Sequence, residues 1–283
     1  MSHTRIPVVA ILSMFLLGSL VNGARAQSKD ADAAPDYGAC PKNHEKWIKD
    51  RFQSGFLTAY AGEPTIWPPQ RYSYRDLFSG TVVGYLVPVM AELTRGNPNF
   101  IGRQLYGFMF KNDEMVKEIN PNAMRSLRIS ENVGPFPKDE REWKEGHSTK
   151  GTNPLTIEYV IPGETVQNWS ELVTVQILSN VSLNIDAARF VAAVEKQHRS
   201  KTPGCAVVAQ RVLASTPTSV MYEQSLVNCA PFRDEFSVRK VIRGPLAISE
   251  VSYAKTSELT DEEKKKWLEI VGKTDLMSEC SKP

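Results

Sequence analysis

Three glutamates surround one predicted loop between two strands and suggest paired-carboxylate chemistry: Glu158, Glu164 and Glu171. Retaining glycosidases use two carboxyl groups about 5 Å apart, one as the nucleophile and one as the acid. However, Glu158 alternates with apolar residues, which is typical of a solvent-facing strand position. Glu171 follows Asn168 by three residues, which is the spacing of a capping box. Solvent-exposed carboxylates are therefore the favoured interpretation.

Three histidines lie beyond residue 26, and histidine is the most frequent general acid or base in enzymes. His44 and His198 fall near the ends of predicted helices and His147 falls in a predicted loop, so we expect all three to be solvated. An active site assembled from distant residues would still escape a search for local motifs. If the chain is a hydrolase, one substitution among four residues should abolish its turnover: His147, His198, Glu158 or Glu171.

The sequence lacks the local motifs that mark a nucleophile, a metal or a phosphate site. It contains no G-x-S-x-G elbow, no H-E-x-x-H and no P-loop. Its cysteines show no C-x₂-C spacing and its histidines no H-x₃-H spacing. We therefore expect no metal and no cofactor, assign no catalytic residue, and favour a protein that is not an enzyme.

Two of the four cysteines are expected to close a hairpin. Pro217 lies midway between Cys205 and Cys229, so a hairpin centred there pairs residues whose numbers add to 434. This register also sets Arg211 opposite Glu223, and an opposite-charge pair across two strands stabilises a hairpin by about 0.2–1 kcal/mol. A register shifted by one residue is the alternative, because the turn has no glycine.

The remaining cysteines, Cys40 and Cys280, are then expected to pair with each other. An even number of cysteines in an exported chain is typical of a disulfide framework. This second bond would join the start of the ordered chain to its end. Free, buried cysteines that pack as small apolar residues are the alternative.

The first 26 residues have the organisation of a secretory signal peptide. Arg5 precedes an uncharged, mostly apolar run over residues 6–21, and an Ala-Arg-Ala box at 24–26 precedes Gln27. The run is shorter than the ~20 residues that span a membrane, which disfavours an anchor. We expect a mature N-terminus at Gln27, a secreted or periplasmic location, and no stable membrane anchor after cleavage.

The charges balance once this segment is removed. The full chain has 34 Lys and Arg residues against 32 Asp and Glu residues, and Arg5 and Arg25 are the charged residues of the signal peptide. The mature chain would therefore have no net charge, whereas a nucleic-acid-binding surface has an excess of basic residues. We expect no nucleic-acid partner. An apolar content of 41% also excludes disorder over most of the length.

Apolar periodicity predicts the elements of the N-terminal half. A helical pattern starts at Asn43, and residues 104–110 read as a strand. Residues 112–114 are typical of a helix start and Asn120-Pro121 of its end. Residues 82–90 are apolar but interrupted by proline, so their type stays open.

In the C-terminal half, strands are predicted at 155–161, 172–178, 205–214, 219–229, 236–242 and 246–254. One helix starts at Asn184 or Asp186, and a capping box of Thr260 with Glu263 starts another that ends at Gly272. This order predicts an antiparallel sheet covered on one side by two helices. The expected fold class is α+β, with a mixed N-terminal half.

The expected organisation has five parts. They are a signal peptide (1–26), a flexible leader (27–39), an N-terminal helical or mixed region (40–133), a linker (134–154) and an α+β domain (155–283). The role of residues 61–133 is not indicated by any motif.

Trp169 lies in the densest local pattern of the chain, Gly163-Glu-Thr-Val-Gln-Asn-Trp-Ser-Glu-Leu-Val-Thr-Val-Gln176, and is expected to anchor the core of the second domain. This pattern resembles a segment of small exported bacterial proteins of unknown function, G-E-[ST]-x-x-x-W-[ST]-E-[LM]-V-T-x-Q. The resemblance covers about residues 155–180, and the order of elements is similar in outline to Mog1/PsbP-like α+β folds. It implies no active site. Asn168 and Asn180 also match glycosylation sequons, which carry no meaning in a bacterial protein.

Three functions are consistent with these patterns. The favoured one is an exported, non-enzymatic binding or interaction module of the bacterial cell envelope, whose partner is an unknown protein or small ligand. The first alternative is an envelope hydrolase that uses carboxylate or histidine catalysis. The second is a structural or assembly factor with an exposed aromatic surface made of Phe100, Tyr106, Phe108 and Phe110.

Overall fold

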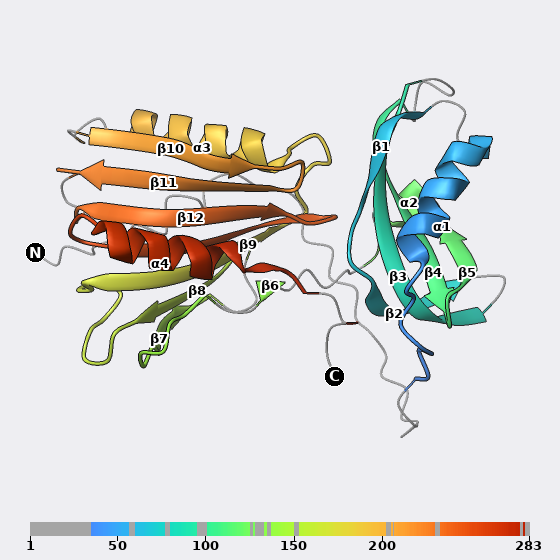
Figure 1. Ribbon diagram of the computed structural model, residues 1–283, viewed down its shortest axis with the longest axis horizontal. Helices are drawn as coiled ribbons and strands as arrows, with labels where there is room; N and C mark the ends of the chain where they lie inside the picture. The colour runs from blue at the N-terminus through green and yellow to red at the C-terminus, as the bar shows by residue number, and fades with distance from the viewer. Residues whose placement is uncertain are drawn as a thin grey trace, which may run out of the picture.

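The computed structural model describes residues 35–56, 60–76, 80–94, 101–124, 127, 133–134, 137–149, 153–201, 205, 207–229, 233–277 and 280. Within these residues the protein is mostly antiparallel β-sheet, arranged in three sheets (Figure 1). The expected α+β class, with two helices covering one side of a sheet, is therefore wrong. The predicted signal peptide and most of the predicted leader lie outside the described residues.

The N-terminal sheet is built around one long strand, β3 (Gly80–Leu93). One edge of β3 pairs with β4, which in turn pairs with β5, whereas β1 and β2 pair with successive stretches of the other edge. These neighbours are β1 (Tyr60–Ile66), β2 (Gln70–Asp76), β4 (Gly102–Lys111) and β5 (Glu114–Ile119).

Pro88 sits inside β3 without disrupting it. The pairing with β1 ends at Val89, and the pairing with β2 begins at Leu86. The carbonyl of Pro88 accepts a hydrogen bond from the backbone N–H of Trp67, in the connection between β1 and β2. Because the N–H and C=O of one strand residue point to the same side, the N–H that proline lacks would also face this gap. The open segment 82–90 is thus a strand.

The predicted helix start at residues 112–114 is instead a hairpin turn. Asn112 and Asp113 both have positive φ angles, 52° and 66°, and join β4 to β5. Two successive left-handed residues form the turn whose twist matches that of the strands, and Asn and Asp tolerate this conformation. The short helix α2 (Pro121–Met124) begins where a helix was expected to end.

Both faces of the N-terminal sheet are covered. Helix α1 (His44–Arg51) and the π-helical turn η2 (Phe52–Phe56) pack Ile48 and Phe52 on one face. That face includes Tyr106, Phe108 and Phe110, which are therefore core residues, whereas Phe100 lies outside the described residues. The expectation that these three aromatics form an exposed surface is not supported.

The C-terminal sheet has the strand order β10-β11-β12-β13-β9-β8-β7. The expected strands all form, and residues 144–148, inside the segment expected as a linker, add β7. The bounds are β7 (Lys144–Ser148), β8 (Leu155–Val160), β9 (Glu171–Ser179), β10 (Val207–Ser215), β11 (Ser219–Val227), β12 (Glu235–Arg243) and β13 (Ala247–Lys255). A two-residue pair of β6 (Val133–Gly134) with β14 (Asp275–Leu276) forms the third sheet.

Two helices pack on opposite faces of the C-terminal sheet, which is why the one-sided arrangement fails. In β13, Ile248 packs with α3 (Ala187–Lys201), whereas Val251 packs with α4 (Asp261–Gly272). Residues an odd number apart along a strand face opposite sides. Figure 1 shows α4 in front of the sheet and α3 behind it. We call these surfaces the α3 face and the α4 face.

The predicted capping residues form at the starts of both α3 and α4. Asp186 accepts a hydrogen bond from the backbone N–H of Arg189 at 2.8 Å, so Asp186 caps α3. Thr260 and Glu263 form the reciprocal capping box of α4. At the other end of α4, the ammonium of Lys240 donates to the carbonyl of Gly272 at 2.9 Å, which suits the negative end of a helix dipole.

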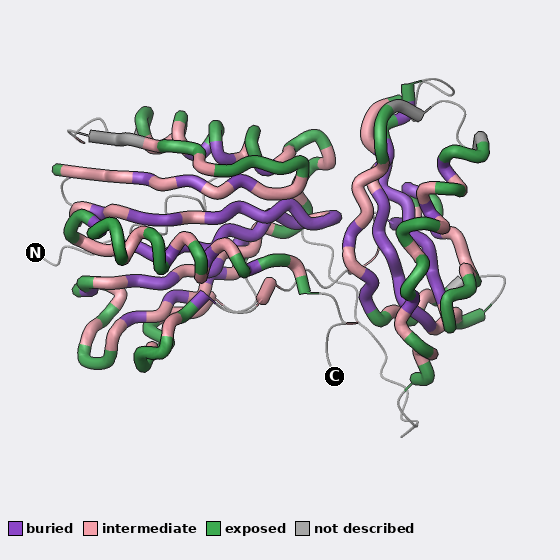
Figure 2. The backbone as a smooth tube through the Cα atoms, in the orientation of Figure 1, coloured by how far each residue is buried: buried purple, intermediate pink, exposed green. Residues whose placement is uncertain are grey.

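The two lobes meet through a buried hydrogen bond and an apolar cluster. The indole Nε1 of Trp67 donates to the carbonyl of Arg243 at 3.0 Å. Leu183, Leu246 and Leu276 from the C-terminal lobe pack against the face of the N-terminal sheet that α1 does not cover. Figure 2 shows the buried backbone concentrated along the central strands of both lobes. No helix among the described residues is long and apolar enough to cross a membrane.

The structure contains two disulfides, and they join the cysteines in the expected pairs. Cys205 bonds to Cys229 with Cα atoms 4.0 Å apart, and Cys40 bonds to Cys280 with Cα atoms 5.6 Å apart. The pairing of β10 with β11 follows the expected sum of 434 from Val207 to Val212. It then shifts by one residue next to the turn, because one residue bulges out of β10.

Trp169 is buried, with 9% of its surface exposed, among Val160, Leu172 and Ala254. We expect Trp169→Ala to lower the free energy of unfolding by about 3–5 kcal/mol, since it leaves a large cavity. The control is Val212→Ala, because Val212 is 54% exposed on the same sheet and should change stability by less than about 0.5 kcal/mol. Urea denaturation of the oxidised protein measures both, and equal effects would contradict the core position.

Candidate functional site

A row of polar side chains crosses the α3 face of the C-terminal sheet. The strand registers set neighbouring residues of five strands directly opposite one another. Residues paired in this way share a face, with Cβ atoms about 4.5–5.5 Å apart. We call this row the polar row, and it consists of Glu158, Thr174, Ser252, Arg239 and Tyr222.

Arg239 is the central charge of this row. Its two terminal nitrogens contact Glu250 and Glu235, each at 2.5 Å, and its Nε donates to the hydroxyl of Ser237 at 2.9 Å. Burial lowers the pKa of Arg239, but the two carboxylates outweigh burial and hold it well above its usual value. The guanidinium is thus permanently charged, with its donors in use.

Tyr222 extends this network under α3. Its hydroxyl donates to Glu250 at 3.1 Å. Burial, followed by the charge of Glu250, raises the pKa of Tyr222 well above its usual value. Tyr222 therefore stays protonated and acts as a hydrogen-bond donor.

Glu158, at the far end of the row, is buried and unpaired. Only 2% of its surface is exposed. Among the described residues it makes no hydrogen bond and no ion pair. Burial, with the charge of Glu235 as a smaller cause, raises its pKa to about 7. The prediction of a solvent-facing Glu158 is therefore wrong: the even-numbered residues of β8 are the buried ones.

Two of the three histidines lie on the same face as Glu158. The register after a bulge in β7 sets His147 directly opposite Glu158. His198, on α3, contacts the amide of Gln224 at 3.2 Å, and burial, then the charge of Arg239, lowers its pKa. His198 is thus half-buried rather than fully solvated. His44 lies on α1 in the other lobe, where its Nδ1 is 2.9 Å from the carbonyl oxygen of Pro41.

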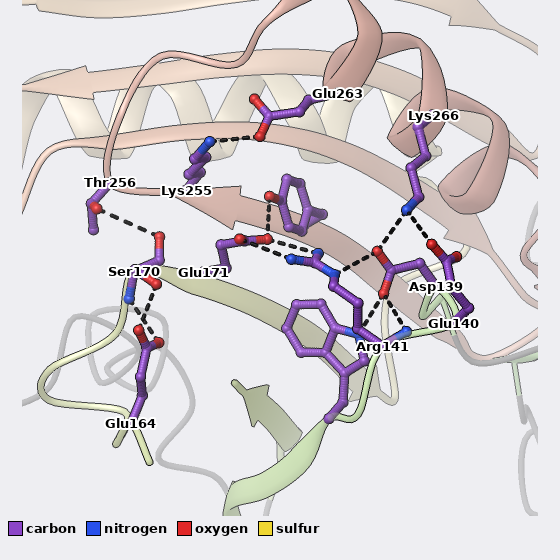
Figure 3. Close-up of polar contacts among 12 residues, drawn as sticks. Asp139, Glu140, Arg141, Glu164, Ser170, Glu171, Lys255, Thr256, Glu263 and Lys266 are labelled. Atoms are coloured by element: carbon purple, nitrogen blue, oxygen red, sulfur yellow. Dashed lines mark hydrogen bonds and ion pairs between the residues drawn. The ribbon is translucent and has the colours of Figure 1, made fainter. Parts of the chain in front are cut away.

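Glu171 belongs to a different network, on the α4 face (Figure 3). Arg141 contacts both oxygens of Glu171, at 2.9 and 2.8 Å, and the hydroxyl of Tyr253 donates to Glu171 at 2.6 Å. Burial raises the pKa of Glu171, but Arg141 and Tyr253 outweigh it and lower the pKa. Glu158 and Glu171 therefore lie on opposite faces and cannot form a catalytic pair.

Asp139 is the second anchor of this network. It accepts bonds from Arg141 and Lys266 at 2.8 and 2.9 Å and from the indole of Trp143 at 2.9 Å. Burial raises its pKa, but these three donors outweigh burial and hold it at about 2. Both carboxylates of this network accept bonds from basic side chains. The network therefore attaches the segment before β7 to β9 and α4, and its role is structural.

Glu164 also has a local role. Its carboxylate accepts bonds from the backbone N–H and the hydroxyl of Ser170, at 2.8 and 2.5 Å, as Figure 3 shows. These bonds close the loop that leads to Trp169, which packs at the end of the α3 face beside Val160. Of the three sequence-predicted glutamates, only Glu158 is left without a partner among the described residues.

Sequence reasoning missed Glu235, Arg239 and Glu250, which complete the α3 face. The available signal was weak: Arg239 and Glu250 lie inside predicted strands, Glu235 directly precedes one, and each has an apolar neighbour on one side only. Where a strand is covered on both faces its charges are buried, and burial requires that they pair. The described cysteine, histidine and acidic residues include no group of three that could hold a metal ion.

We expect Glu158→Gln to stabilise the protein at about pH 8 and to have little effect near pH 4. The folded protein holds the pKa of Glu158 at about 7, above its usual 4.5. The protonated group therefore favours folding below about pH 4.5, and this contribution is lost as the pH rises through 7, at a cost of about 3 kcal/mol. Urea denaturation across this range measures the effect. Glu145→Gln, an exposed carboxylate on β7, is the control; parallel pH profiles for wild type and Glu158→Gln would contradict the burial.

Asp139→Asn should have the opposite pH dependence. The pKa of Asp139 is held at about 2, below its usual 3.8. Its stabilisation is therefore complete above about pH 4 and disappears as the pH falls through 2. We expect the variant to lose about 1–2 kcal/mol at pH 7 and little at pH 2. Thermal unfolding at both pH values measures this, and an equal loss at the two would show that the charge plays no part.

Comparison with known proteins adds no relative. No protein-family model matches this chain, and no curated protein matches it. The resemblance of residues 155–180 to small exported bacterial proteins therefore remains an expectation, and the site stands on the geometry above.

Proposed function

We propose that the protein is an exported, non-enzymatic binding module of the cell envelope and that the α3 face around Glu158 binds its ligand. The observation that carries this proposal is that Glu158 is 2% exposed and has no partner among the described residues. An unpaired buried carboxyl group is costly, so folded proteins normally provide it with a partner. A ligand that supplies the missing contact gives such a group a function.

Export is supported by two independent features. The two disulfides are typical of proteins that fold in an oxidising compartment. The N-terminal sequence has the composition of a secretory signal. We propose a secreted or periplasmic location on these grounds.

The accessibility of the face supports binding. Thr174 and Gln176, next to Glu158, are only half-buried, whereas Glu235 and Glu250, the two carboxylates that contact Arg239, are buried. A ligand would therefore reach the row from the β8–β9 side. Arg239, Glu235 and Glu250 contact one another, so we assign them a structural role rather than a catalytic one.

The test is to recover the ligand of the exported, oxidised protein by native mass spectrometry of the purified form. We expect a small molecule that the wild type and Glu145→Gln retain and that Glu158→Gln and Thr174→Leu lose by tenfold or more. Thr174→Leu fills the half-buried position next to Glu158 and is the second variant. A ligand retained equally by all four proteins would place the binding site elsewhere.

A hydrolase remains the second candidate, because a specific pair favours it. His147 lies opposite Glu158 in the register, and a carboxyl group with a pKa of about 7 suits a general acid or base. Turnover of peptidoglycan, ester or phosphoester substrates that is lost in both Glu158→Gln and His147→Asn would establish it. Turnover unaffected by either variant would point to contamination.

A further inference from the structure

The α3 face offers one carboxylate that is free to accept a bond from a ligand. Glu235 and Glu250 both contact Arg239, so that guanidinium already offsets part of their charge. Glu158 is the described carboxylate of the face that lacks such a contact. The missing partner of Glu158 must therefore come from outside this network.

The charges on the face favour a cation as that partner. Arg239 carries one positive charge, and Glu235 with Glu250 carry two negative charges. Once Glu158 is ionised, the cluster has two more negative than positive charges. Attraction between charges is stronger where water is excluded, and Val160, Leu172 and Trp169 make one side of Glu158 apolar.

The neighbouring groups define the kind of cation. The hydroxyl of Thr174 and the amide oxygen of Gln176 lie on β9, next to Glu158, and the hydroxyl of Ser252 lies on β13, one strand further. A primary ammonium carries three donors and no acceptor, so one carboxylate and two or three neutral oxygens satisfy it. A calcium ion requires six to eight oxygen ligands, which is more than this set provides.

We propose that the α3 face binds a primary amine, whose ammonium group pairs with Glu158 between the hydroxyls of Thr174 and Ser252. This inference rests on the proposed function, because it names the ligand class of the same site. The amine approaches from the β8–β9 side, and its alkyl part lies toward the half-buried surface of β9.

The proposal makes binding depend on pH in one direction. An ammonium ion binds the ionised form of Glu158, so affinity should rise about tenfold per pH unit up to about 7 and then level off. A neutral ligand that accepts a bond from protonated Glu158 would show the reverse. The other titratable and charged groups on this face come from β7, β11, β12, β13 and α3, and they are Lys144, His147, Tyr222, Glu235, Arg239, Arg243, Glu250 and His198.

The experiment compares n-butylamine with n-butanol, two probes of equal length that differ in charge, by isothermal titration calorimetry between about pH 5 and pH 8. We expect butylamine to bind the wild type with an affinity that increases with pH, and with release of up to one proton below pH 7. Butanol should bind at least tenfold more weakly. Glu158→Gln should abolish butylamine binding, whereas Glu145→Gln should retain it.

Three outcomes would overturn the assignment: no binding of butylamine to the wild type, an affinity independent of pH, or unchanged binding in Glu158→Gln. If butanol binds as tightly as butylamine and Glu158→Gln weakens both, the face binds neutral ligands. The proposed function would then stand and the amine class would fail. Folding of Glu158→Gln is checked by its circular dichroism, and Thr174→Leu provides a second variant that blocks the same position.

Discussion

Strand β12 carries two guanidinium groups on the same face, four residues apart, and the C-terminal lobe depends on them. Arg239 offsets the charges of Glu235 and Glu250. Arg243 donates to the carbonyls of Ile185 and Ala247, both at 2.9 Å, and to that of Gly244. Without these donors, buried acceptors would lose their bonds, at a cost of about 1–3 kcal/mol each. One strand therefore carries Arg239 of the polar row and also Arg243, whose carbonyl accepts the bond from Trp67 at the lobe junction.

The α3 face of β12 is polar along only part of the strand. Along β12, the residues that face α3 change from Glu235, Ser237 and Arg239 to Val241. The polar end lies near His198 in the last turns of α3, and the apolar end packs against the first turns of the helix. The charge network is therefore continuous with the core rather than a surface feature.

Short-range signals predicted the local structure well. The capping box at Thr260 and the hairpin register of Arg211 with Glu223 depend on residues close in sequence, and both form. The turn at Asn112 was mistaken for a helix start because Asn and Asp favour both. The fold class failed because the sequence specifies which residues share a face, and not which face each helix covers.

The candidate site was only partly predictable for the same reason. In β8, Leu155, Ile157 and Tyr159 alternate with Glu158, and this pattern normally places a glutamate in solvent. In the structure, the face of β8 with Leu155, Ile157 and Tyr159 is less buried than the face with Glu158. The residues that flank Glu158 in the sheet, His147 and Thr174, come from β7 and β9, and no local pattern reveals this register.

The bond between Cys40 and Cys280 closes the chain from residue 40 to residue 280 into one covalent ring that includes both lobes. A protease that cuts one exposed connection inside this ring would open it without separating the pieces. The nicked protein would keep its intact mass, apart from one added water, until a reductant is present. The two ends of this ring also lie side by side, with Cα atoms 5.6 Å apart. Relocating the chain termini to another surface turn therefore requires only a short connection across this point.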